Sequence, residues 1–157
     1  MRLLVVSDSH GDGFSLRRAI DAQPTARAVF HLGDGVREAG EMEKLYPDRT
    51  FYMVRGNCDF AAGSLYPEVG MVELEGRRIV YLHGYTHRVK SGMAAVIGLA
   101  RQQQADILLF GHTHRALSTY EDGLYILNPG SVARSGTYGV VDITPAGIVT
   151  SLRENDR

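Results

Sequence analysis

Two histidines that follow a short apolar run constrain this chain more than any other feature. The run, residues 107–110, has no polar alternation, which is typical of a strand buried in a sheet. Gly111 opens a turn directly after it, and His112 and His114 follow at a spacing that lets two imidazoles bind metal together. The pair alone is weak evidence for a metal site. Five more residues able to act as ligands follow other apolar runs: Asp8, His10, Asp34, Asn57 and His83.

Ligand sites in open α/β sheets lie beyond the carboxyl ends of the strands. All seven candidates occupy that position after a predicted strand, and neighbouring glycines permit tight turns and a close approach of the backbone. A sheet that brings these ends together would gather seven ligands at one edge. Taken singly, each has a simpler explanation: a histidine can be structural, Asp34 a turn residue or helix cap, and Asn57 a turn former.

Composition limits the function classes that are open to the chain. Its 157 residues, 44% of them hydrophobic, favour one globular domain over residues 1–157 with a substantial core. A net charge of −1 leaves no basic stripe for long nucleic acids, although short nucleotides stay possible ligands. The first apolar run, residues 3–6, is too short for a signal sequence or membrane span, so we expect a cytoplasmic protein without a membrane partner. The single Cys58 excludes an internal disulfide, which fits a reducing compartment.

The first half of the chain alternates predicted strands and helices. We expect strands at residues 2–6, 27–32 and 50–54. Apolar residues at helical spacing predict one helix over residues 14–23, closed by Pro24, and another from Val36 to Tyr46, stopped by Pro47. This order with short links predicts right-handed crossovers and a largely parallel sheet.

The second half has a different pattern. Two runs around Gly76, residues 69–75 and 77–82, predict a hairpin, and helical spacing follows over residues 89–100. After the buried strand, we expect a closing set of antiparallel strands at residues 117–120, 124–127, 137–143 and 148–152. A parallel first half and an antiparallel second half favour two packed sheets with helices outside.

Five motifs resemble the signature of the calcineurin-like metallophosphoesterases in order and type: Asp8-x-His10, Gly33-Asp34, Gly56-Asn57, His83-Gly84 and Gly111-His112-Thr113-His114. The run from Asn128 to Ser131 is similar to the small single-domain bacterial and archaeal phosphodiesterase branch. Together with the strand pattern, the resemblance implies an α/β fold with four layers, an αββα sandwich in which helices flank two mixed β-sheets.

The resemblance also implies a centre of two divalent metal ions. The first would be bound by Asp8, His10, Asp34 and His114, and the second by Asp34, Asn57, His83 and His112. Four positive charges would then face two carboxylates, and the surplus would attract phosphate and acidify a bridging water, whose hydroxide attacks phosphorus. Ligands without thiolate suit Mn foremost, or Fe, Ni, Co or Zn, more than Mg or Ca. The implied function is a phosphodiesterase for small phosphorylated or nucleotide-like substrates.

Two positions depart from the pattern of the family. Many members have a histidine after the Gly-Asn pair, where this chain has Cys58, and the family often has a further histidine where this chain has Tyr85. We expect Cys58 to be a buried thiol that packs beside the site and Tyr85 to be a partly buried aromatic. Without an acid at position 58, activated or diester substrates should turn over better than alkyl monoesters.

A few polar residues near the candidates allow a functional or a structural interpretation. Arg55 and Arg134 could contact substrate phosphate, or they could be solvated at the surface. His31 is expected in the core or in support of the ligands, and His87 at the surface or the mouth of the site. Asp12 is expected to cap a helix.

Two other functions stay open at the level of sequence. A phosphomonoesterase or protein phosphatase would keep the metal ligands and differ in its pocket, and Cys58 in place of histidine argues mildly against it. A non-catalytic interaction scaffold, like the retromer subunit that resembles this family, would have lost ligands. All seven are retained here.

Overall fold

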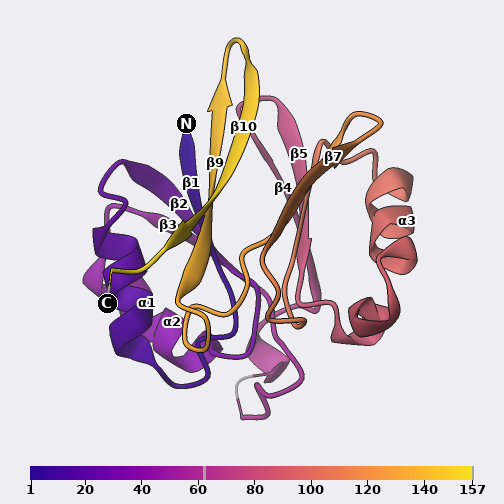
Figure 1. Ribbon diagram of the computed structural model, residues 1–157. Coiled ribbons are helices and arrows are strands. Elements are labelled where there is room, and N and C mark those ends of the chain that lie inside the picture. The colour runs from indigo at the N-terminus through magenta and orange to yellow at the C-terminus, as the bar shows by residue number, and fades with distance from the viewer. Residues whose placement is uncertain (62, 157) are drawn as a thin grey trace.

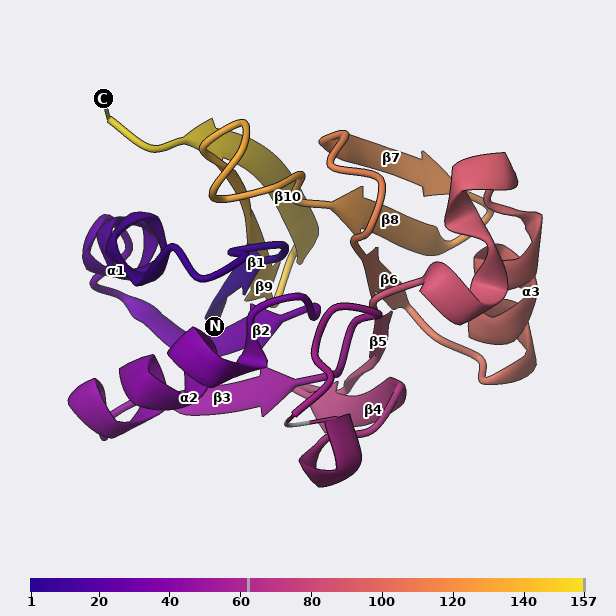
Figure 2. The ribbon, with the colours of Figure 1, turned by 90° about the horizontal axis from the view of Figure 1, so that it is seen from below.

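Two five-stranded sheets face each other in the structure, a computed structural model that describes residues 1–61 and 63–156 (Figure 1). The first sheet has the strand order β10 (Gly147–Glu154), β9 (Thr137–Thr144), β1 (Arg2–Val6), β2 (Ala26–His31), β3 (Thr50–Met53). The second has the order β4 (Val69–Leu74), β5 (Arg77–Leu82), β6 (Ile107–Phe110), β8 (Leu124–Asn128), β7 (Leu117–Glu121). Helices α1 (Gly13–Asp21) and α2 (Val36–Leu45) cover the outer face of the first sheet, and α3 (Ala94–Gln102) covers that of the second (Figure 2). The predicted αββα sandwich is confirmed.

Strand β1 is buried on both faces, as its unbroken apolar run predicts. Leu4 and Val6 pack with Ile20 of α1, whereas Leu3 and Val5 point into the core between the sheets. The two clusters therefore attach the helix layer and the second sheet to opposite faces of the same strand.

The core between the sheets contains a group of aromatic rings. Phe30 of β2 stacks on Tyr52 of β3 with ring centroids 4.9 Å apart, and it meets Tyr81 of β5 edge-on at 5.1 Å. On the far side of the second sheet, Val96 and Ala100 attach α3. Each layer is thus held by apolar contacts to the next.

Local signals explain where the helices begin. Asp12 accepts a hydrogen bond of 2.9 Å from the amide of Ser15, so the predicted cap of α1 is confirmed. The predicted helix over residues 89–100 begins later than expected, because Gly92 has φ 137° and separates the 3₁₀ turn Val89–Ser91 from α3. None of the helices in residues 1–61 and 63–156 is long and apolar enough to cross a membrane.

The last four strands do not form the single antiparallel set that the sequence predicted. The β9–β10 hairpin extends the first sheet, with β9 antiparallel to β1. The β7–β8 hairpin completes the second sheet, where β8 is parallel to β6. Hairpins are local and can be predicted from turns at positions such as Asp122, but the sheet that each joins depends on contacts distant in sequence.

The parallel strands bring their carboxyl ends to one edge of the sandwich. Strands β1, β2 and β3 run parallel in the first sheet, and β5 and β6 run parallel in the second. Their loops lie at the lower edge in Figure 1, which faces the viewer in Figure 2. All predicted ligands belong to these loops.

Candidate metal centre

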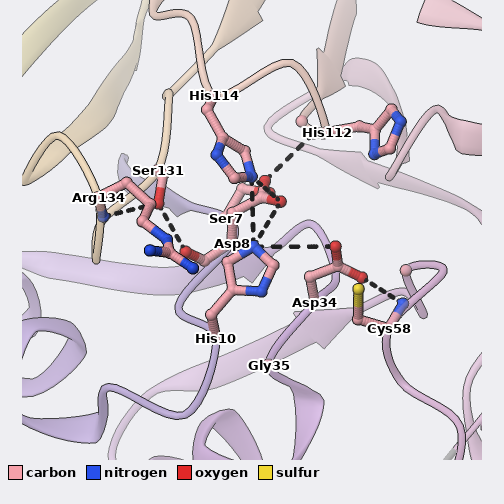
Figure 3. A network of polar contacts seen from close by, with 12 residues as sticks. Ser7, Asp8, His10, Asp34, Gly35, Cys58, His112, His114, Ser131 and Arg134 are labelled. Atoms are coloured by element: carbon pink, nitrogen blue, oxygen red, sulfur yellow. Dashed lines mark hydrogen bonds and ion pairs between the residues drawn. The ribbon is translucent and has the colours of Figure 1, made fainter.

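The predicted ligands from both sheets meet at this edge in two adjoining groups. In the first group, Asp8 Oδ1 lies 3.0 Å from His114 Nε2 and 3.4 Å from His10 Nε2 (Figure 3). The two ring nitrogens are 3.2 Å apart. Asp8 and His10 follow β1 while His114 follows β6, so this group joins the two sheets.

The second group gathers around His83, which follows β5. Its Nε2 lies 3.0 Å from Asn57 Oδ1 and 3.1 Å from His112 Nδ1. Asp34 stands between the groups, because its Oδ2 is 3.3 Å from His83 Nε2 and 3.9 Å from His10 Nε2. All seven predicted residues are therefore brought together.

The separations within each group are those of a ligand shell. Ligand atoms bound at about 2.1 Å to an octahedral ion are about 3 Å from their neighbours. Imidazole nitrogens as close as those of His10 and His114 repel each other unless a proton or a cation lies between them. His83 Nδ1 lies 2.7 Å from the carbonyl oxygen of Leu32, which can only accept, so the neutral ring presents an unprotonated Nε2 to the site. The donor set fits divalent cations.

Electrostatics keep the carboxylate at the junction ionised. Burial alone would raise the pKa of Asp34, but the hydrogen bond and charge of His83, the Cys58 amide and the charge of His10 lower it to about 2. Burial would likewise lower the pKa of His83, and the carboxylates of Asp34 and Asp8 outweigh burial and raise it. Burial lowers the pKa of His112, and the charges of His83 and Lys90 add to this effect. The site is an ionised, partly desolvated cluster of the kind that occurs at functional centres.

Most of the predicted ligands have an uncommon backbone conformation. Left-handed φ values occur at Asp8 (56°), His10 (45°), Asp34 (57°), His112 (68°) and His114 (59°). This conformation costs a non-glycine residue roughly 1–2 kcal/mol, so it persists only where surrounding contacts enforce it. Among those contacts, the amide of Asp8 donates to Gly33 O at 3.0 Å and that of His10 donates to Asp34 O at 2.9 Å.

Comparison with known proteins identifies the family. A family model for the calcineurin-like phosphoesterase superfamily domain matches residues 1–145. The chain belongs to this superfamily. Over 150 residues it is 33% identical to YsnB of Bacillus subtilis, named a probable metallophosphoesterase, with 91% of this chain and 85% of that protein covered. It is 27% identical to the phosphodiesterase YfcE of Escherichia coli, with 90% and 88% covered. A crystal structure from Streptococcus pneumoniae, described as a predicted phosphoesterase, superposes with a TM-score of 0.77 at 28% identity and covers 97% of each chain.

Cys58 and Tyr85, the two residues that depart from the superfamily pattern, are both more exposed than predicted. Cys58 is exposed, not buried, because its thiol faces the site: Sγ lies within 4.8 Å of ligand atoms of His10 and Asp34. Tyr85 is 57% exposed, whereas a partly buried ring was predicted. It lies edge-on to His112 with ring centroids 5.4 Å apart. Both side chains thus border the centre of this calcineurin-like phosphoesterase.

The two arginines differ in their surroundings. Arg55 is half-buried and lines a small pocket together with Asn57 and His83. Its guanidinium pairs with Glu68 at 3.2 Å and donates to the carbonyl of Tyr66 at 3.1 Å. Arg134 is exposed, and its side chain extends toward Asp8 and His10 in Figure 3. Both arginines therefore lie near the predicted ligands, and a contact of either one with substrate stays a prediction.

The Asn128–Ser131 motif forms hydrogen bonds to two of the loops that carry predicted ligands. Asn128 Nδ2 donates to Gly111 O at 3.1 Å and to Thr113 Oγ1 at 3.0 Å, which fixes the loop that carries two histidines. Ser131 Oγ donates to the carbonyl of Asp8 at 2.8 Å. The motif that marks the small branch is thus a structural support of the site.

Sequence reasoning missed Asp59, which joins two ligand loops. Its carboxylate accepts hydrogen bonds from the amides of Asp34 (2.7 Å), Gly35 (2.9 Å), Val36 (3.2 Å) and Gly56 (2.7 Å). It therefore caps α2 and links the loop after β2 to the loop after β3. The available signal was the absence of a capping side chain at Gly35.

A buried polar chain was also missed, apart from His31 itself, which is buried as expected. The amide of Gly33 donates to His31 Nδ1 at 3.2 Å, so His31 Nε2 carries the proton and donates to Ser9 Oγ at 2.9 Å. Ser9 Oγ donates to Glu38 Oε1 at 2.6 Å, which also accepts from the amide of Gly11 at 2.7 Å. This series of hydrogen bonds connects the Asp8–His10 loop to β2 and α2.

His87, which was predicted at the surface or the mouth of the site, is half-buried.

Proposed function

We propose that this calcineurin-like phosphoesterase hydrolyses diesters of small phosphorylated or nucleotide-like compounds at a centre of two divalent metal ions. Asp8, His10, Asp34 and His114 would bind one ion, and Asp34, Asn57, His83 and His112 the other. Residues 1–157 would act as one domain. The observation that supports this most is the place of Asp34, whose Oδ2 is 3.3 Å from His83 Nε2 and 3.9 Å from His10 Nε2.

The composition of the site suits an anionic substrate. When bound, the ions would supply the positive charge that holds phosphate and acidifies water. The five neutral side chains around Asp8 and Asp34 preserve about two units of that charge. Mn is the ion we expect first, with Fe, Ni, Co and Zn as alternatives, because the ligands combine imidazole, amide and carboxylate.

The residues around the leaving group favour diesters over monoesters. Cys58 occupies the position after Asn57 and faces the site, so no imidazolium is available there to protonate a departing alkoxide. Tyr85 and Arg134 border the centre and can donate hydrogen bonds to phosphate oxygens. Substrates with good leaving groups should therefore react fastest.

Metal removal and restoration test the proposal. Protein stripped with EDTA should lose hydrolysis of bis-p-nitrophenyl phosphate, and Mn²⁺ should restore it. The rate with this diester should exceed the rate with p-nitrophenyl phosphate. A ratio below one would favour the phosphomonoesterase. Protein that is inert to both esters while elemental analysis finds it loaded with metal would favour the scaffold. The cytoplasmic location stays a prediction.

A further inference from the structure

A pocket of about 580 Å³ lies beside the candidate metal centre. It is formed where the segment before α3 faces the loop between β6 and β7, on the side of the second sheet (Figure 2). Thr113 lines it and lies between His112 and His114 in the chain, so one loop borders both the pocket and the centre. Its volume falls within the range of small-molecule sites, about 300–1,000 Å³.

The lining of this pocket combines apolar surface with positive charge. Its apolar lining includes the buried Phe110 and Val89 and the half-buried Met93. Lys90 and Arg115 supply two cations, and neither forms an ion pair with an acidic side chain in residues 1–61 and 63–156. All the lining residues are neutral or basic.

The polar side chains of the pocket that can still donate a hydrogen bond to a ligand are Lys90, Arg115 and Thr113. The Asn128 amide is already bonded to Gly111 O and Thr113 Oγ1. Thr113 Oγ1 also accepts from the amide of Arg115 at 3.1 Å. Since both its lone pairs are engaged, the Thr113 hydroxyl is left to donate its proton to a ligand. An anionic group on an apolar ring would satisfy this lining.

We propose that this Lys90–Arg115 pocket binds the organic arm of the substrate, and that this arm is a nucleoside carrying a second phosphate. The proposal rests on the proposed function, because the scissile phosphodiester would lie at the neighbouring metal centre. The base and sugar would pack on Met93 and Leu117, which are only partly buried, and the second phosphate would contact Lys90, Arg115 and Thr113.

A matched pair of substrates isolates the second phosphate. We would compare thymidine 5′-(p-nitrophenyl phosphate) with the same ester carrying a 3′-phosphate, both in Mn²⁺-loaded protein. Wild-type protein should have the higher kcat/KM with the 3′-phosphorylated ester. In Lys90→Gln/Arg115→Gln this preference should fall about tenfold, through KM, because two charge-assisted contacts are lost. Lys44→Gln/Arg153→Gln removes two exposed cations outside the pocket and should keep the preference.

Binding without turnover separates this inference from the proposed function. In EDTA, thymidine 3′,5′-bisphosphate should shift the ¹⁵N-amide signals of Lys90, Thr113 and Arg115, and the double variant should bind about tenfold more weakly. Such binding, combined with no hydrolysis of any ester, would support the pocket proposal and refute the proposed phosphodiesterase function. Two results would overturn the pocket proposal even if the protein is an active phosphodiesterase. One is an equal fall of kcat/KM for both esters in the double variant. The other is that thymidine 3′,5′-bisphosphate shifts only amide signals of residues outside the pocket.

Discussion

Asp34 is the residue on which the two halves of the site depend. Its carboxylate is nearly buried, has a pKa of about 2, and accepts a hydrogen bond of 2.8 Å from the Cys58 amide through the oxygen that faces away from His83. Gly56 leaves the room that this requires, because a Cβ there would lie 2.1 Å from Asp34 Oδ1. Gly56 is therefore needed because a side chain at this position would collide with Asp34, and not only because it permits a turn.

Asp34→Asn should remove the negative charge that both ions would share. We expect at least one ion to be lost and kcat/KM for bis-p-nitrophenyl phosphate to fall by a factor of about 100 or more. Elemental analysis and steady-state kinetics measure the two effects. Asp48→Asn, an exposed aspartate outside the site, is the matched control. Near-normal metal content and turnover in Asp34→Asn would refute the shared role.

Cys58→His tests whether position 58 faces the leaving group. An imidazolium there should protonate poor leaving groups, so hydrolysis of diphenyl phosphate should rise about tenfold or more relative to bis-p-nitrophenyl phosphate. Cys58→Ser, which adds no acid of suitable pKa, should leave the ratio of the two rates unchanged. If a folded, metal-loaded Cys58→His shows no gain, the leaving oxygen lies elsewhere.

At the scale of elements, the site depends on how the strand-end loops are joined. Asp59 holds the loops after β2 and β3 through four amides. Asp59→Asn leaves one oxygen where there were two and removes the charge, so we expect a loss of about 2–4 kcal/mol in the free energy of unfolding and weaker metal binding. Urea unfolding and a Mn²⁺ titration measure these effects. Asp122→Asn, in an exposed hairpin turn, should change stability by less than about 0.5 kcal/mol. If Asp59→Asn were as stable as wild type, Asp59 would not hold the two loops together.

The His31 chain gives the loop after β1 a dependence on pH. Burial lowers the pKa of His31 in the folded protein, and the unfolded chain has the ordinary pKa of about 6.5. The unfolded state therefore binds the extra proton, and the free energy of unfolding should fall as pH drops below about 6.5. Urea unfolding in EDTA between pH 7.5 and 5.5 should show a smaller fall in His31→Gln than in wild type. Identical slopes would show that His31 does not contribute.

The sequence was informative about elements and residue types, and less so about their connections. Unbroken apolar runs predicted β1 and β6 to the residue, and the positions after such runs predicted the ligands that the structure brings together. Asp59 was not predicted because its partners are backbone amides, and the one signal in the sequence was the lack of a capping side chain at Gly35. The parallel pairing of β8 with β6 escaped for a similar reason, since a short apolar run does not specify its neighbour.

At the scale of the whole molecule, the site is a polar bridge between two sheets whose shared core is apolar. Asp8, His10, Asp34 and Asn57 belong to loops of the first sheet, and the three remaining predicted ligands belong to the second. The shortest contacts cross this boundary, as between His114 and Asp8 (3.0 Å). Ions bound here would connect the two halves of the sandwich, and unfolding would have to release them.

Metal should therefore stabilise the entire fold. An ion at 100 times its Kd adds about 2.7 kcal/mol, which raises Tm by about 5–11 °C for a chain of this size. Calorimetry of EDTA-stripped protein with and without Mn²⁺ measures the shift. His112→Gln, which removes one predicted ligand of one ion, should lose about half of the shift, whereas Lys44→Gln should keep it. A full shift in His112→Gln would take His112 out of the ligand set. If Mn²⁺ does not change the Tm of the wild-type protein, the seven predicted ligands do not bind the metal, and the fold is stable without it.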